Sequence, residues 1–391
     1  MTKQQKQFNH PKSEVFPQRV VQAREQLALS QAELADSLGV QVAYLAGIES
    51  GQRLPSQSLM RKLAAILARQ NPLLRDQLFV LAGFAPPHAS ARHEAYEALL
   101  KNSDPQDFEN YLNLVNVLVK SGELALAQEY IDLGFRVYSE TLELQMLIAF
   151  YELVRKNYAL ALQAIENAIE FKQRGIESNY PMAELLLNRG VVLFFEGSTL
   201  LAQKYQTQEA KAAGQFAEKA MQRFREALDS YLQGLTLESD NILLLDEAAR
   251  VSFNIADLLD PEAARPYWHN AILLFREVLS SDHKQSLGDK NVRESGCFLA
   301  HAYTKSQQWD QARETLGLIT TYQPDDWFAR FVFACHFALF AAAHDDPAAR
   351  QRALRQLELA LPHQAQIYAM ALQEPDLAAI HPEIAALEAS A

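Results

Sequence analysis

The sequence has few of the residues that build covalent or metal-held scaffolds. Among 391 residues there are two cysteines, Cys297 and Cys335, both in apolar stretches and neither in a CxxC or Cys/His spacing. A disulfide framework needs more cysteines, and a zinc site needs several closely spaced ligands. We therefore expect both cysteines to be small core residues of a reduced, cytoplasmic protein.

Motifs for catalysis and cofactor binding are also missing. The chain has no glycine-rich phosphate loop, no HExxH, no GxSxG and no zinc-ligand spacing. Its paired carboxylates, Asp325-Asp326 and Asp345-Asp346, come at expected helix starts, where acidic side chains cap the backbone and oppose the helix dipole. We therefore expect no enzymatic activity, no catalytic residue, no metal and no cofactor.

Long uncharged apolar runs are absent as well. The first residues, MTKQQKQFNHPKSEVFPQR, carry scattered charge, and no later stretch of 18 residues lacks a charge or a strongly polar group. A secretory signal and a membrane span each need an apolar run. The chain is expected to stay in the cytoplasm and to have no membrane partner.

The charges that are present divide unevenly along the chain. The whole sequence has a net charge of −12, but residues 1–91 hold ten basic and six acidic side chains, a net charge of +4. The remainder holds 26 basic and 42 acidic side chains, a net charge of −16. A basic head can approach the phosphates of a nucleic acid, whereas an acidic body is repelled from them.

Two short helices joined by a tight turn are predicted from LSQAELADSLGVQVAYLAGIESG, residues 29–51. Ser30 and Glu33 have the spacing of a capping box, and Gly39 ends the first helix because glycine adopts a left-handed conformation without a Cβ clash. The second helix is expected over about Gln41–Glu49. This is the helix-turn-helix layout, in which the second helix enters the major groove by its N-terminal residues.

The same stretch resembles the Xre family, the regulators similar to lambda repressor and Cro. SQAELADSLGV, IESGQRLPS and the amphipathic LMRKLAAILA carry the resemblance over about residues 16–70. The resemblance implies a homodimer that binds double-stranded DNA at a palindromic operator. The alternative is a bundle of the same fold that has lost DNA binding and contacts proteins instead.

The resemblance also implies which side chains contact DNA. It places Gln31 against a phosphate and against Gln41, and it places Gln41 and Val42 at base edges. An amide pairs with adenine, and an apolar group contacts the methyl group of thymine. Arg24 and Arg53 are expected to contact phosphates, and Tyr44 is expected to contact a base or a phosphate. The full expected set is Arg24, Gln31, Gln41, Val42, Tyr44 and Arg53.

One more amphipathic helix is predicted from NPLLRDQLFVLAGF, with Asn71 as its cap and Pro72 at its first position. Its leucine stripe either seals the bundle or pairs with a second copy of the chain, and the stripe consists of Leu74, Leu78 and Leu81. The proline-rich APPHASAR that follows, residues 85–92, is the best domain boundary. We expect a DNA-binding head at 1–84, a linker and first body helix at 85–105, and a sensor and dimerisation body at 106–391.

A period of 34 residues runs through the body. Aligning SGELALAQEYIDLGF with RKNYALALQAIENAI pairs Ala127 with Ala161 and Ile131 with Ile165. A helix-turn-helix unit of this length is that of the tetratricopeptide repeat. The clearest unit is CFLAHAYTKSQQWDQARETLGLITTYQP, which has its small landmark at Ala300.

Six such units, three regular and three distorted, are expected between about 106 and 361. An insertion at 205–224 is expected to form extra helix, and 374–387 resembles the closing segment that caps such arrays. The sequence has no strand pattern. The predicted fold is therefore all-α, with a helix-turn-helix bundle followed by a right-handed superhelix that has a concave groove.

Groove positions follow from the small landmark of each unit, because residues just after it and one turn later face inward. Polar side chains there suit the backbone and carboxylate of an extended peptide, and phenylalanines suit its side chains. The alternative is that these are polar residues on the wet side of a solenoid. The expected ligand-binding residues are Asn116, Lys120, Phe150, Arg250, Asn254, His301 and Lys305.

This domain order resembles the peptide-sensing regulators of Gram-positive bacteria, the Rgg/PlcR type. The resemblance implies a transcriptional regulator whose repeat domain binds a peptide or another effector that modulates DNA binding. The alternative is a regulator or adaptor whose repeat domain is a scaffold for a partner protein, such as an antirepressor, with no small ligand.

Overall fold

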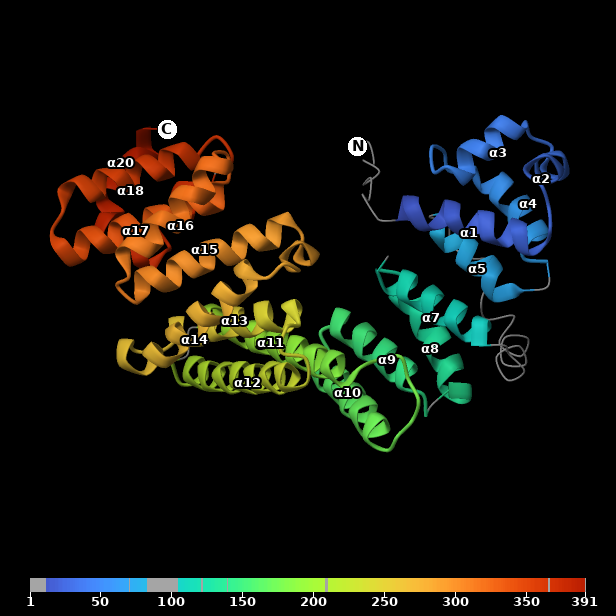
Figure 1. Ribbon diagram of the computed structural model, residues 1–391, viewed down its shortest axis with the longest axis horizontal. Helices are drawn as coiled ribbons and strands as arrows, with labels where there is room; N and C mark the ends of the chain where they lie inside the picture. Colours follow the sequence, from blue (N-terminus) through green and yellow to red (C-terminus); the bar gives the residue numbers. More distant parts are fainter. Residues whose placement is uncertain are drawn as a thin grey trace. The chain divides into compact units, whose positions relative to one another are not determined.

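The computed structural model describes residues 12–69, 71–82, 105–120, 122–138, 140–207, 210–364 and 366–390. Every regular element in these ranges is a helix, which confirms the all-α fold (Figure 1). The helices group into two compact units, residues 1–179 and 180–391.

The first unit begins with a helical head. Its described helices are α1 (Lys12–Gln26), α2 (Gln31–Leu38), α3 (Val42–Glu49), α4 (Gln57–Leu67) and α5 (Pro72–Leu81). Their apolar side chains share one core, in which Phe16, Val20, Leu45 and Met60 are fully buried. Because α3 enters this core by its inner side, its outer side stays on the surface.

The turn between α2 and α3 forms as predicted. The Ser30 hydroxyl accepts a hydrogen bond from the backbone N–H of Glu33, and the Glu33 carboxylate accepts one from the backbone N–H of Ser30. Gly39 has a φ of 69° and ends α2 in the left-handed conformation. Gln41 is the N-cap of α3, so only Val40 separates the glycine from this cap.

Helix α5 closes the head. The Asn71 side chain accepts a hydrogen bond of 2.9 Å from the backbone N–H of Leu74, which confirms the predicted cap. Leu74, Leu78 and Leu81 are all buried in the core of the head. The stripe therefore seals the bundle, and the alternative that it pairs with a second copy is wrong because none of the three side chains is accessible.

Helix pairs follow the head. The first unit continues with α7 (Pro105–Lys120), α8 (Leu124–Tyr138), α9 (Leu142–Val154) and α10 (Tyr158–Gln173). The predicted linker at 85–92 lies outside the described residues.

The second unit holds the remaining pairs. They are α11 (Met182–Gln206) with α12 (Ala210–Leu237), α13 (Ile242–Asp257) with α14 (Pro261–Ser280), α15 (Asp289–Lys305) with α16 (Trp309–Tyr322), and α17 (Trp327–His344) with α18 (Pro347–Ala360). A short helix, η2 (Lys284–Leu287), precedes α15. The six pairs described in the two units correspond to the six predicted repeats.

Glycine allows close contact between the two helices of a pair. A Cβ atom on Gly134 of α8 would collide with the ring of Tyr111 of α7. A Cβ atom on Gly190 of α11 would likewise collide with the ring of Tyr231 of α12. Both tyrosines are fully buried, so each ring fills the space that the missing side chain leaves.

The inserted segment lengthens one pair. Within the predicted insertion, residues 205–206 form the end of α11, which stops at Gln206, and residues 210–224 form the first part of α12, which starts at Ala210. The extended part is held by an ion pair of 2.9 Å between Arg223 and Glu196. The insertion therefore forms no separate helix.

The array ends in a cap made of α19 (Ile367–Ala371), η3 (Pro375–Ile380) and α20 (His381–Ser390). Leu377, Ile380 and Ile384 are fully buried in one core with residues of α17 and α18. The predicted closing segment is thus confirmed.

Both cysteines are free and buried, Cys297 in α15 and Cys335 in α17. Burial raises the pKa of each thiol, which keeps it protonated and unreactive. They are core residues, as expected.

Two described helices, α11 and α17, are long and apolar enough to cross a membrane by length and composition. Core helices of soluble proteins pass the same test, and each of these two packs against the partner of its pair. The observation is therefore weak evidence for a membrane span.

Candidate functional site

The outer face of α3 is the first candidate site. Gln41 and Val42 are exposed at its N-terminal end, and Val42 keeps 45% of its surface accessible although it is apolar. Leu45 and Ile48, on the inner side, are fully buried. The start of α3 therefore exposes the Gln41 amide and the apolar Val42 side chain, two groups of the kind that contact base edges.

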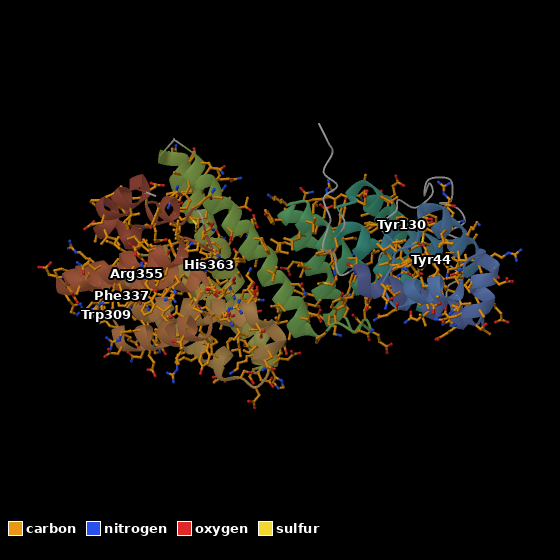
Figure 2. The ribbon with its side chains drawn as sticks, turned by 90° about the horizontal axis from the view of Figure 1, so that it is seen from above. Tyr44, Tyr130, Trp309, Phe337, Arg355 and His363 are labelled. Carbon is orange, nitrogen blue, oxygen red and sulfur yellow. The ribbon has the colours of Figure 1, made fainter. Side chains whose placement is uncertain are left out.

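Arg53 and Tyr44 lie together beside this face. The guanidinium of Arg53 lies 5.5 Å from the centroid of the Tyr44 ring, and its aliphatic stem packs on Gly47 (Figure 2 labels Tyr44). The cation–π contact orients an exposed positive charge next to α3. The expected phosphate contact of Arg53 stays a prediction.

Arg24 has a different place from the one expected. Its Nε lies 2.7 Å from Glu49 Oε1, a second nitrogen lies 3.1 Å from Glu49 Oε2, and a third donates to the Leu29 carbonyl at 2.8 Å. Only 12% of its side chain is exposed. The expected phosphate contact of Arg24 is corrected accordingly, because its donors are directed inside the head.

Gln31 joins the same buried group. Its side-chain amide donates a hydrogen bond of 2.7 Å to Glu49, so the expected contact with Gln41 is replaced by one with the end of α3. The hydrogen bond to Glu49 raises the pKa of Arg24 against the effect of burial. Arg24, Gln31 and Glu49 therefore tie α1 and α2 to the C-terminal end of α3.

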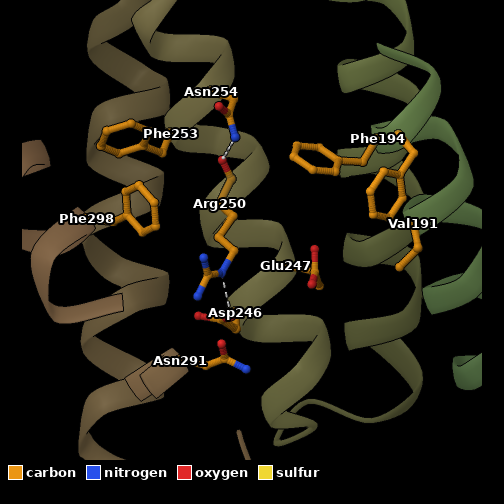
Figure 3. A pocket seen from close by; sticks show the side chains of 10 residues that line it. Val191, Phe194, Asp246, Glu247, Arg250, Phe253, Asn254, Asn291 and Phe298 are labelled. Carbon is orange, nitrogen blue, oxygen red and sulfur yellow. Dashed lines mark hydrogen bonds and ion pairs between the residues drawn. The ribbon is translucent and has the colours of Figure 1, made fainter. Parts of the chain in front are cut away.

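A cavity in the second unit is the second candidate site. It has a volume of about 440 Å³ and lies between α11, α13 and α15 (Figure 3). Two of the expected ligand-binding residues, Arg250 and Asn254, line it. The other lining residues are Val191, Phe194, Phe195, Asp246, Glu247, Phe253, Asn291 and Phe298.

Arg250 is already paired inside this cavity. Its Nε lies 2.7 Å from Asp246, a terminal nitrogen lies 3.7 Å from Glu294, and its guanidinium stacks on the Phe298 ring at 5.2 Å. Ser295 donates a hydrogen bond of 2.6 Å to the other oxygen of Asp246. The positive charge of Arg250 is thus balanced by the protein itself.

Asn254 and Glu247 offer oxygen atoms to the same cavity. The Asn254 amide nitrogen donates to the Arg250 carbonyl at 2.7 Å, which leaves its side-chain oxygen as the atom for a ligand. Burial, followed by the negative charge of Asp246, raises the pKa of the Glu247 carboxyl group. The cavity therefore combines apolar walls with hydrogen-bond acceptors.

His301 and Lys305 do not line the cavity. His301 Nε2 lies 3.0 Å from Asp376 Oδ2, and Lys305 bonds to the other carboxylate oxygen of Asp376, which belongs to the C-terminal cap. Burial opposes ionisation of Asp376, but His301 and Lys305 outweigh it and lower its pKa. These two expected ligand contacts are corrected: both side chains hold the cap.

The other expected ligand-binding residues lie in the first unit. Asn116 is half-buried and Lys120 is exposed, both on α7, and Phe150 of α9 packs against the core of the first pairs. Their role in ligand binding stays a prediction.

The head is similar in sequence to a known protein family. Residues 20–69 match the family model described as helix-turn-helix. The head is a helix-turn-helix domain. The predicted Xre-like head is thus confirmed for this part of the chain, and no curated protein matches the chain.

Three solved structures are similar to the chain. The tetratricopeptide-repeat protein YrrB, described as having an unusual peptide-binding site, has 16% identity and a TM-score of 0.39 over 62% of this chain and 97% of its own. The Cut9-Hcn1 assembly of APC/C has 16% identity and a TM-score of 0.32 over 95% and 69%. Apo ComR, a competence regulator from Streptococcus vestibularis, has 14% identity and a TM-score of 0.26 over 88% and 97%.

Proposed function

We propose that the protein is a cytoplasmic, sequence-specific DNA-binding regulator of transcription that acts without a catalytic step. The observation that carries the proposal is the exposed start of α3, flanked by Arg53 on the Tyr44 ring, in a helix-turn-helix domain. Gln41 and Val42 contact base edges, and Arg53 contacts a phosphate.

The regulator binds a palindromic operator as a homodimer. Helix-turn-helix heads recognise half-sites about one helical turn apart, and two-fold symmetry of the protein matches that of the operator. The buried leucines of α5 take no part in the dimer, so the contact between copies lies elsewhere on the chain.

The repeat domain binds an effector that modulates DNA binding. The cavity between α11, α13 and α15 supports this part of the proposal, since its size and its mixture of aromatic walls and polar groups are those of a small-ligand or peptide site. None of the described residues of 197–222 lines it.

One observation favours the alternative of a protein-binding scaffold. His301 and Lys305 pair with Asp376 of the cap, so these two expected peptide contacts are occupied by the protein itself. On that alternative, a partner protein binds the repeat domain and no small ligand is needed.

Footprinting on genomic DNA of the protein's own host, with and without a low-molecular-weight cell extract, tests the proposal. A palindromic site whose occupancy changes with the extract supports an effector-gated regulator. A site that the extract leaves unchanged favours the scaffold, and the absence of any site overturns the regulator.

A further inference from the structure

We infer that the cavity between α11, α13 and α15 selects a ligand that carries a positive charge on an aromatic or branched apolar body. The N-terminal ammonium group of a peptide that begins with such a residue has this chemistry. The inference rests on the proposed effector-binding function and specifies the class of effector.

The charged side chains at the cavity favour a positively charged ligand. Asp246, Glu247 and Arg250 line it, and Glu294 lies 3.7 Å from the guanidinium of Arg250. Lys290 also lies 3.6 Å from Glu294, so two positive groups stand against three carboxylates and one negative charge is in surplus. Since Arg250 is held at 2.7 Å by Asp246, a ligand carboxylate would have to displace an existing ion pair, whereas a ligand cation meets a surplus of negative charge.

Glu247 is the carboxylate that an incoming cation would meet. Its side chain projects from α13 into the space in front of α11, apart from the Arg250–Asp246 pair (Figure 3). Burial and the charge of Asp246 raise the pKa of Glu247, although the Arg250 guanidinium and a hydrogen bond with Tyr231 act in the opposite direction. A bound ammonium group would add to the effects that favour the charged form.

The apolar walls favour a ligand with an aromatic or branched apolar body. Phe194 of α11 faces Phe253 of α13 and Phe298 of α15 across the cavity (Figure 3), and Phe195 of α11 also lines it. Phe195 keeps 49% of its surface accessible, although a phenylalanine in a helical repeat normally enters the core. Because Arg250 already covers the face of Phe298, the rings of α11 remain to contact the body of a ligand and its cation.

Two amides complete the arrangement. Asn254 and Asn291 line the cavity on either side of Arg250 (Figure 3). Amides of this kind orient a bound peptide by hydrogen bonds to its backbone. The site therefore has aromatic walls, two side-chain amides and a surplus of negative charge. Together these groups fit an aromatic residue with a free N-terminus.

Three dipeptide probes that share the same side chains but differ in their terminal groups and net charge test the inference. Phe-Phe-amide is cationic, N-acetyl-Phe-Phe-amide is neutral, and N-acetyl-Phe-Phe is anionic. Binding to the full-length chain is measured by titration calorimetry and ligand-observed NMR at about pH 6.5, where an α-amino group is protonated. We expect the cationic probe to bind about tenfold more tightly than the other two.

Glu247→Gln is the matched variant, because it keeps the shape of the side chain and removes its charge. It is expected to lower affinity for the cationic probe about tenfold and to leave the neutral probe unchanged. Glu184→Gln is the control, since Glu184 lies on α11 of the same unit and does not line the cavity. Unchanged binding of the neutral probe also shows that the variant is folded.

Equal or tighter binding of an acetylated probe overturns the inference but leaves the cavity as an effector site. Absence of binding by all three probes also overturns it. In both cases the proposed function is decided separately by the genomic footprint with and without extract, so the two failures are distinguishable.

Discussion

The Tyr130 hydroxyl of α8 donates a hydrogen bond of 2.6 Å to the Asp76 carboxylate of α5 (Figure 2 labels Tyr130). Both residues are buried, and α5 also packs against α7. The bond therefore joins the helix-turn-helix domain to the first helix pair. Within the first unit it is a direct polar link between the head and the repeats.

Removing the hydroxyl by Tyr130→Phe should loosen this link. The loss of a hydrogen bond to a buried carboxylate is expected to lower the free energy of unfolding by about 1.5–3 kcal/mol. Amide hydrogen exchange over α5 should accelerate, while α3 keeps its protection. Tyr322→Phe is the control, because Tyr322 is 79% exposed. Unchanged exchange over α5 would show that the bond does not hold the two parts together.

Arg24→Ala and Arg53→Ala should both weaken DNA binding, but for different reasons. Arg24→Ala leaves Glu49 buried without its cation, which is expected to destabilise the head by about 3–5 kcal/mol. Arg53→Ala should leave the thermal melting of the head unchanged and reduce the salt dependence of DNA binding by about one counterion.

Circular dichroism melting and DNA titrations at several salt concentrations separate the two effects. Arg174→Ala is the control, because Arg174 is an exposed arginine at the end of α10, outside the head. A folded Arg24→Ala head with a reduced salt dependence would instead restore Arg24 as a phosphate contact.

His336 should make stability depend on pH. Burial, with a smaller effect of Arg313, lowers the pKa of His336 to about 4, below the value of about 6.5 in an unfolded chain. The unfolded state therefore binds more protons between these values. The contribution of His336, up to about 3 kcal/mol, is complete above pH ~6.5 and is lost as the pH falls toward ~4.

Urea denaturation across this pH range measures the effect. His336→Gln should flatten the pH dependence of the free energy of unfolding, whereas His283→Gln should not, because His283 is exposed. Parallel profiles for the wild type and His336→Gln would contradict the assignment.

Asp376→Asn should release the C-terminal cap. The substitution keeps the shape of the side chain but removes the charge that His301 and Lys305 share, and breaking such a buried pair is expected to destabilise by about 3–5 kcal/mol. Hydrogen exchange over η3 and α20 should therefore accelerate. The exposed Asp282→Asn serves as the control. If exchange in the cap stays at the wild-type rate, the ion pairs do not retain it.

Local features of the fold were predictable from the sequence because their causes are local. The Ser30 capping box and the left-handed Gly39 each depend on residues within one helical turn. The 34-residue period likewise predicts the helix pairs, since each repeat places its small and aromatic residues at fixed positions. The order of helices follows from these patterns.

Polar pairs between distant residues were not predictable in the same way. Arg24 and Glu49 are 25 positions apart, and Lys305 and Asp376 are 71 apart. No periodicity links such residues, and an arginine near a DNA-binding helix has the same appearance in the sequence whether it binds a phosphate or a buried carboxylate. The partner is decided by packing, which only the structure provides.

Selection of binding sites from a random duplex DNA library tests whether the protein reads DNA through α3. The full-length protein and its Gln41→Ala, Arg53→Ala double variant are used side by side, with circular dichroism to show that both are folded. We expect the wild type to enrich a palindromic site and the variant to enrich none. No enriched site for the wild type, or the same site for both proteins, would contradict DNA binding through the face of α3.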